Sequence, residues 1–143
     1  MKTVLIVNGP NLNLLGAREN DIYGDITYDS LVSMIKNRAD ELGISVDVFQ
    51  SNHEGQIVDR LNAAAKNIDA LIINPAAYTH TSVAIRDAIS ALSVRVYEIH
   101  ISNIHKREEF RHQSYVSGVA DGVICGFGAD GYIMALEHVA KTL

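Results

Sequence analysis

The chain has 143 residues, of which 48% are hydrophobic and 20% are charged, and it carries a formal net charge of −5 at pH 7. This length favours one domain, residues 1–143, that buries a core without metal or disulfide staples. The net negative charge disfavours a general nucleic-acid or anionic-membrane surface, and the single cysteine, Cys125, excludes an intrachain disulfide framework and a thiolate metal cluster.

No apolar run approaches the roughly 18 residues that a membrane-spanning helix needs. The first residues, MKTVLIV, begin like a signal peptide, but this run ends at Asn8 in a polar turn. We interpret it as a first strand. The composition therefore favours a cytoplasmic enzyme or binding domain.

Apolar, β-branched runs alternate with segments of helical periodicity. In chain order the predicted elements are strand Thr3–Val7, helix Tyr28–Leu42, strand Ile44–Phe49, helix Gln56–Asn67, strand Ala70–Ile73, helix Ser82–Leu92, strand Val94–Ile99, helix Arg107–Ser114, strand Val119–Cys125 and helix Asp130–Thr142. Near-continuous apolar strands indicate a sheet that is covered on both faces. The alternation predicts a flavodoxin-like α/β three-layer sandwich around a five-stranded parallel sheet of order 2-1-3-4-5.

The helix ends also carry signals. Gly43 closes the first predicted helix, and the predicted N-terminal caps are Ser51-Asn52, Thr81 or Ser82, and Asp130. The irregular segment Pro10–Thr27 has little apolar content, which is typical of a mobile lid and also of a plain surface loop.

Polar groups gather where the predicted strands end. Asn74-Pro75 stops the third strand, because proline offers no N–H to the sheet, and a run of polar side chains follows. Ligands bind beyond the carboxyl ends of strands in such sheets, near the point where the strand order reverses. We therefore expect Asn11, Asn74 and His80 to line one crevice, with His100 one strand further.

Glu98 and His100 are two residues apart, so both side chains leave the same face of an extended strand. A carboxylate beside an imidazole holds its tautomer and raises its basicity, as a general acid or base requires. A purely structural pair is the alternative. For the remaining histidines we expect solvated surface positions, which are His53, His105, His112 and His138.

Two arginines have possible roles. Arg18 lies five residues before Tyr23 in the possible lid. Lowering the phenol's reference pKa near 10 by about three units costs about 4 kcal/mol, which one close cation can supply. Arg111 could clamp a substrate carboxylate through a bidentate contact or be an exposed helix arginine.

Gly126, Gly128 and Gly131 match the dinucleotide fingerprint G-x-G-x-x-G. The chain holds no further strand with an acidic residue about 20 positions on, so we interpret the run as a tight turn. Histidines without paired spacing predict no metal site.

The motifs NGPNLNLLGAREND-YG, SNHEG, NPAAYTHTSVAIRDA, HISN and REEFRHQS, in this order, closely resemble type II 3-dehydroquinate dehydratase over nearly the whole chain. One departure is Ala76, where the family usually shows glycine. The resemblance implies a cofactor-free dehydration of 3-dehydroquinate to 3-dehydroshikimate through an enolate, by anti elimination, in the shikimate pathway.

The resemblance also implies residue roles. Tyr23 would be the base and Arg18 would favour its ionised form, while His100 would be the general acid, supported by Glu98. Asn11 would help to position Tyr23 or an ordered water, and Asn74 would hold the contact that stabilises the enolate. The substrate's hydroxyls and carboxylate would bind His80, the backbone at Ile101, Ser102 and Arg111.

Asp87 lies about 8 Å into its predicted helix at 1.5 Å per residue, so it points away from its own crevice. In the family this position reaches a neighbouring subunit's site, and members form trimers that assemble into dodecamers. A flavodoxin-like binding module for flavin or a phosphorylated ligand, and a metal-dependent hydrolase using His80 and His100, remain as rival functions. The sequence does not distinguish a biosynthetic from a quinate-catabolic enzyme.

Overall fold

The computed structural model describes residues 1–17 and 19–143, so the prediction for Arg18 lies outside the described residues. Five parallel strands form one sheet, namely β1 (Thr3–Asn8), β2 (Ser45–Gln50), β3 (Ala70–Asn74), β4 (Arg95–His100) and β5 (Gly122–Cys125). Their order is β2-β1-β3-β4-β5. This confirms the predicted flavodoxin-like topology.

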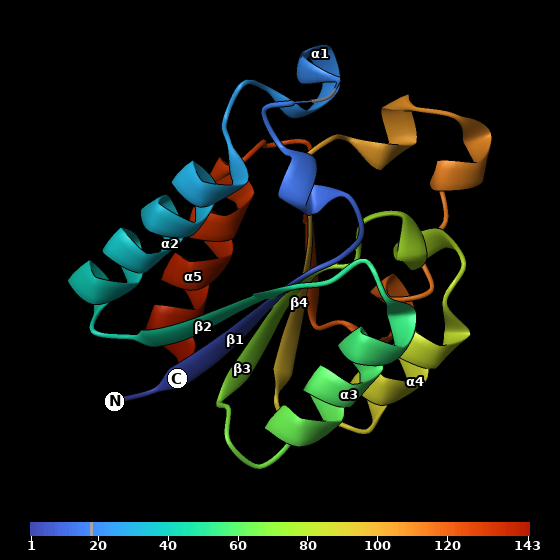
Figure 1. Cartoon of the computed structure of the whole chain (residues 1–143). Helices are drawn as coiled ribbons and strands as arrows, with labels where there is room; N and C mark the ends of the chain where they lie inside the picture. Colours follow the sequence, from blue (N-terminus) through green and yellow to red (C-terminus); the bar gives the residue numbers. More distant parts are fainter. Residues whose placement is uncertain (18) are drawn as a thin grey trace.

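Helices cover both faces of the sheet (Figure 1). Helices α2 (Tyr28–Leu42) and α5 (Asp130–Thr142) lie on one face, and α3 (Glu54–Ala64) and α4 (Val83–Ser90) lie on the other. Successive β1 side chains alternate between the two cores: Ile6 packs with α2 and α5, whereas Val7 packs with α3 and α4. Two covered faces explain the near-continuous apolar strands of the sequence.

Short elements crowd the carboxyl end of the sheet. They are the helix α1 (Asn20–Tyr23) and the one- to two-turn 3-10 helices η1 (Leu12–Leu14), η2 (Ala76–His80), η3 (Ile104–Lys106) and η4 (Glu109–Arg111). A further 3-10 helix, η5 (Ser117–Val119), instead precedes β5 and lies against α4. Figure 1 shows α1 projecting beyond the strand ends. The chain therefore places its irregular, polar segments at one edge of a rigid sheet.

The helix ends confirm part of the capping prediction. Ser82 caps α4, since its Oγ accepts the backbone N–H of Ile85 at 2.9 Å, and Gly43 ends α2 with a φ of 71°. The predicted caps of the other two helices were wrong: the cap positions are His53 for α3 and Ala129 for α5.

The predicted helix Arg107–Ser114 was also wrong. Residues 104–111 form two separate 3-10 turns, because Arg107 itself has extended backbone angles. The side chains of this segment bond to distant partners around the strand ends, and those tertiary contacts override its helical pattern. Strand β5 begins at Gly122, three residues after the predicted start at Val119, which belongs to η5.

No helix within the described residues is long and apolar enough to cross a membrane.

Candidate active site

A pocket with a volume of about 130 Å³ opens beyond the carboxyl ends of β1, β3 and β4. Most of the predicted site residues line it, namely Asn11, Tyr23, Asn74, His80, His100, Ile101, Ser102 and Arg111. These residues come from five separate segments of the chain. The expectation that the strand ends form one crevice is therefore confirmed.

His100 forms one end of this pocket. It ends β4, is 4% exposed, and its Nε2 hydrogen bonds to Oε2 of the fully buried Glu98. The predicted pairing of these two side chains on one face of the strand is confirmed. Because Nε2 is engaged by the carboxylate, Nδ1 is the ring nitrogen that remains for a ligand.

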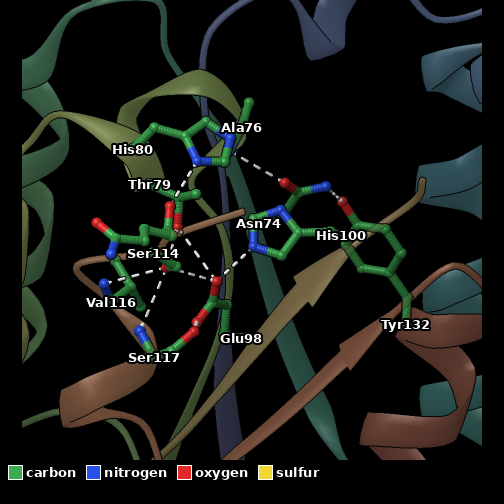
Figure 2. Close-up of polar contacts among 11 residues, drawn as sticks. Asn74, Ala76, Thr79, His80, Glu98, His100, Ser114, Val116, Ser117 and Tyr132 are labelled. Atoms are coloured by element: carbon green, nitrogen blue, oxygen red, sulfur yellow. Dashed lines mark hydrogen bonds and ion pairs between the residues drawn. The ribbon is translucent and has the colours of Figure 1, made fainter. Parts of the chain in front are cut away.

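Three hydroxyl groups surround the Glu98 carboxylate (Figure 2). Oε1 lies 2.6 Å from the Ser117 hydroxyl, and Oε2 lies 2.8 Å from that of Ser114 and 3.2 Å from that of Thr79. The Thr79 and Ser114 hydroxyls are 2.6 Å apart, so they share their two protons among these contacts. We call Thr79, Ser114 and Ser117 the hydroxyl cage.

The hydroxyl cage helps to stabilise the buried negative charge of Glu98. Burial alone raises the pKa of the Glu98 carboxyl, but the hydrogen bond and charge of His100 and the hydroxyls of Ser117 and Ser114 outweigh it, and the net pKa lies below its ordinary value. Glu98 is therefore ionised at neutral pH. This carboxylate, in contact with Nε2, fixes the orientation of the His100 ring.

Tyr23 and Arg107 form the other end of the pocket. Nη1 of Arg107 donates a hydrogen bond to the Tyr23 hydroxyl at 2.8 Å, and the guanidinium carbon lies 5.3 Å from the centroid of the tyrosine ring. The Arg107 side chain is only 13% exposed and also lies 3.9 Å from a carboxylate oxygen of Glu19. The phenol oxygen of Tyr23 therefore accepts a charge-assisted hydrogen bond from a largely buried guanidinium.

Sequence reasoning missed Arg107. Within the motif REEFRHQS the sequence assigns a role to Arg111 alone, and a helix starting at Arg107 places that side chain on an exposed first turn. The signal that could have identified it is composition: two arginines follow the polar end of β4 within a few residues of Ser102.

His80 lies at the end of η2 with a defined tautomer. Its Nδ1 lies 2.7 Å from the carbonyl oxygen of Gln113, which can only accept, so Nδ1 carries the proton. Burial lowers the pKa of His80, and the charges of His100 and Arg111 lower it further. A neutral ring with a protonated Nδ1 leaves Nε2 as a hydrogen-bond acceptor.

Arg111 supplies a cation to the pocket. Its Nε donates to Glu108 at 2.6 Å, a contact that leaves the terminal nitrogens for an anionic ligand. Ser102 contributes a hydroxyl, and Ile101 lines the same wall with its backbone and side chain. The guanidinium groups of Arg107 and Arg111 and several neutral polar groups therefore surround a space of small-molecule size.

The floor of the pocket is built by Asn74 and Ala76. Asn74 is 3% exposed, and its Oδ1 accepts the backbone N–H of Ala76 at 3.1 Å. Ala76 has a φ of 53°, a left-handed conformation that costs a residue with a Cβ about 1–2 kcal/mol. This geometry explains why glycine is the easier residue at the position.

Asp87 does not line the pocket. It is exposed on α4, as the sequence predicted for a residue that points away from its own crevice. Asn11 has a φ of 68° just before η1, and its backbone N–H donates to Asn52 at 3.0 Å. This contact ties the start of the predicted lid to the turn after β2.

The glycine-rich run after β5 forms the expected turn. Gly126 and Gly128 have φ values of 93° and 58°, and the chain passes from them into α5. Among the described residues that line the pocket there is no lysine.

The chain matches the family model described as Dehydroquinase class II over residues 2–140. Among curated proteins it is 57% identical to the "Catabolic 3-dehydroquinase" of Emericella nidulans, over 97% of this chain and 91% of that protein. It is 55% identical to the "3-dehydroquinate dehydratase" of Caldicellulosiruptor bescii, over 100% and 99%.

Solved structures give the same relationship. The type II dehydroquinase from Butyrivibrio crossotus superposes with a TM-score of 0.95 at 48% identity, covering 96% of this chain and 97% of the other. The type II dehydroquinase from Propionibacterium acnes gives 0.96 at 43% identity, covering 99% and 97%. The chain belongs to the class II dehydroquinase family.

Proposed function

We propose that this protein is a 3-dehydroquinate dehydratase that eliminates water through an enolate, by anti elimination and without a cofactor. The observation that carries the proposal is the pairing of two groups in one pocket. A phenol bonded to a guanidinium lies at one end, and an imidazole backed by a buried carboxylate lies at the other. Relatives named as 3-dehydroquinate dehydratases at 55% identity supply the substrate.

Tyr23 acts as the base. A hydrogen next to a ketone is acidic enough for a phenolate when the enolate is stabilised. Arg107 supports this role because its guanidinium donates directly to the phenol oxygen. Arg18 remains a second proposed cation beside Tyr23.

His100 acts as the acid. Hydroxide is a poor leaving group and needs a proton as the carbon–oxygen bond breaks. With Nε2 held by Glu98, the proton reaches the leaving oxygen from Nδ1 of the imidazolium. Base and acid stand on separate elements, which suits elimination from opposite faces of the ring.

The proton taken up by Tyr23 and the proton given by His100 balance over one turnover. The Tyr23 phenolate takes the proton next to the ketone, and the electron pair of that bond becomes the enolate. The carbonyl then re-forms, a carbon–carbon double bond appears, and the hydroxyl on the neighbouring carbon leaves with the His100 proton as water. One net proton returns from Tyr23 to His100 through solvent before the next turnover.

The remaining residues bind and orient the substrate. Arg111 binds the carboxylate, while Ser102, the Ile101 backbone and the acceptor Nε2 of His80 bind hydroxyl groups. Asn74 holds the water or amide contact that stabilises the enolate, and Asn11 helps to position Tyr23 or an ordered water. All of these residues line the pocket.

We also propose that the chains form trimers that assemble into a dodecamer in the cytoplasm, with Asp87 reaching a neighbouring subunit's pocket. Its exposure on α4, outside its own pocket, supports this. Mixed oligomers of Asp87→Ala and Tyr23→Phe chains test it: activity above that of either variant alone supports a shared site, and no complementation contradicts it.

We place the reaction in the shikimate pathway. Relatives named "Catabolic 3-dehydroquinase" and "3-dehydroquinate dehydratase" match this chain at similar identity, so the dehydration itself is what their names have in common.

The direct test is to mix the protein with 3-dehydroquinate and to follow the ultraviolet absorbance of the conjugated enone. We expect the absorbance to rise. Protein that has been treated with a chelator should give the same rise, and so should protein treated with borohydride, because no Schiff base forms. Unchanged absorbance at every pH tested would refute the assignment. Inactivation by borohydride would refute the phenolate mechanism.

A further inference from the structure

A chain of hydrogen-bonded polar side chains runs behind the pocket floor, from α2 by way of β1 and α5 to the end of β3. It consists of Tyr28, Asn8, Tyr132 and Asn74, of which Asn8 and Tyr132 are 0% exposed. Tyr132 does not line the pocket. Figure 2 shows its hydroxyl aimed at the Asn74 side chain.

The hydrogen bonds in this chain have definite directions. Asn8 donates from Nδ2 to the Tyr28 hydroxyl at 3.3 Å, and its Oδ1 accepts the Tyr132 proton at 2.7 Å. Asn74 donates from Nδ2 to the Tyr132 oxygen at 2.9 Å. Asn8 and Tyr132 therefore each act as donor on one side and acceptor on the other.

The Tyr132 hydroxyl has only one possible pattern of donation and acceptance in this chain of hydrogen bonds. Burial raises its pKa far above the ordinary value, so the phenol keeps its single proton at every working pH. That proton is committed to Asn8. The phenol oxygen is then purely an acceptor toward Asn74.

This commitment fixes the orientation of the Asn74 amide. If the amide turned over, its oxygen would face the phenol oxygen of Tyr132, and its NH₂ would face the backbone N–H of Ala76, which now donates to Oδ1. Both contacts would be lost and replaced by repulsion. Two independent partners thus hold the amide in one orientation.

We propose that Tyr132 is a positioning residue for the elimination: it locks the Asn74 amide so that an N–H, rather than a carbonyl oxygen, is available to the substrate oxygen on which the enolate charge develops. Asn74 uses one Nδ2 hydrogen for Tyr132, and among the described residues its second hydrogen has no partner. The inference rests on the proposed function.

Two physical arguments favour this role over a structural one. Donors aimed in advance at a developing negative charge accelerate the reaction, whereas an amide free to turn would present a repelling oxygen part of the time. Burying three polar side chains stabilises a fold no better than apolar packing of similar volume would. The contribution of the network is therefore the orientation that it gives to the Asn74 amide.

The test is a double-mutant cycle between Tyr132→Phe and Asn74→Ala. Phenylalanine keeps the ring packing and removes only the hydroxyl. We expect Tyr132→Phe to lower kcat about tenfold with little change in KM, a fraction of the 10²- to 10³-fold cost of deleting a whole oxyanion donor. In the Asn74→Ala background the same change should cost no further activity.

Matched variants separate positioning from folding. Tyr28→Phe acts two hydrogen bonds further away, so it should give a smaller loss of kcat that likewise vanishes in the Asn74→Ala background. This variant keeps the test decisive if Tyr132→Phe does not fold. Tyr97→Phe, which packs on α5 through His138, should leave kcat unchanged. Equal losses in both backgrounds, or full activity of folded Tyr132→Phe, would overturn the inference. Wild-type inactivity would instead refute the proposed function.

Discussion

The two ends of the pocket are built in different ways. At the acid end, His100 and Glu98 belong to a central strand, both are buried, and the hydroxyl cage surrounds the carboxylate. At the base end, Tyr23 stands on a helix of four residues and meets the cation Arg107 from another loop. The acid is part of the core, whereas the base is assembled from surface segments.

This difference predicts which substitutions lower turnover alone and which also lower the free energy of unfolding. A buried charge at the acid end has no solvent to replace a lost partner, so changes there should lower both turnover and the free energy of unfolding. A helix of four residues adds little stability of its own. Changes at the base end should therefore lower turnover and leave stability nearly unchanged.

The largest loss of turnover is expected for Tyr23→Phe. Removing a general base costs about 10²- to 10⁴-fold in kcat, while the ring and its packing remain. The enone absorbance assay measures turnover, and thermal unfolding should match the wild type within about 1 °C. A fully active variant would refute the role of Tyr23, and a large drop in Tm would break the contrast between the two ends.

Glu98→Gln should come next, with kcat about a hundredfold lower because a neutral amide no longer stabilises the imidazolium of His100. Unlike Tyr23→Phe, this change should also destabilise the fold, by about 1–3 kcal/mol in urea unfolding, since the amide fits the hydroxyl cage poorly. Wild-type stability in this variant would show that the acid end is not the tightly coupled unit described.

Arg107→Gln should lower kcat about tenfold to thirtyfold, the value of one charge-assisted hydrogen bond. Arg107→Lys keeps the charge but loses the planar fork, so it should recover part of the activity. Both variants should unfold like the wild type. If Lys were no better than Gln, the charge of Arg107 would not be what supports Tyr23.

The smallest effect is expected for Ser117→Ala, and it should depend on pH. The pKa of Glu98 is below its ordinary value of 4.5 in the fold, so its ionisation stabilises the protein above that pH and this stabilisation is lost as the pH falls through the lowered pKa. Losing one hydroxyl brings the folded pKa closer to the unfolded one.

Ser117→Ala should therefore be less stable than the wild type by about 1 kcal/mol at pH 7, and the gap should close as the pH falls below the ordinary value. Urea unfolding from pH 3 to pH 7 measures it. The control is Ser90→Ala on the exposed end of α4, for which a constant small difference is expected. A gap for Ser117→Ala that did not change with pH would contradict the charge-based account of the hydroxyl cage.

The same contrast explains what the sequence could predict. The periodicity of β4 was enough to pair Glu98 with His100, because neighbours on one strand face are set by backbone geometry alone. The helices α2 and α5 follow equally local rules, whereas the sheet order follows from the doubly wound architecture that alternating strands and helices adopt.

The base end and the hydroxyl cage could not be derived in this way. Arg107 and Tyr23 are 84 residues apart, and Ser117 reaches Glu98 across 19 residues from the short 3-10 helix η5. Such contacts depend on the path of loops, which propensity does not encode. The error over Arg107–Ser114 came from the same source.

The division of labour between Tyr23 and His100 can be tested most directly by proton exchange in D₂O. His100→Gln should still exchange the substrate hydrogen next to the ketone for deuterium, followed by NMR, while forming almost no enone, because the base and the enolate are intact and only the acid is missing. Tyr23→Phe should neither exchange nor dehydrate above the enzyme-free rate. Exchange by Tyr23→Phe, or none by a folded His100→Gln, would contradict the assignment of base and acid.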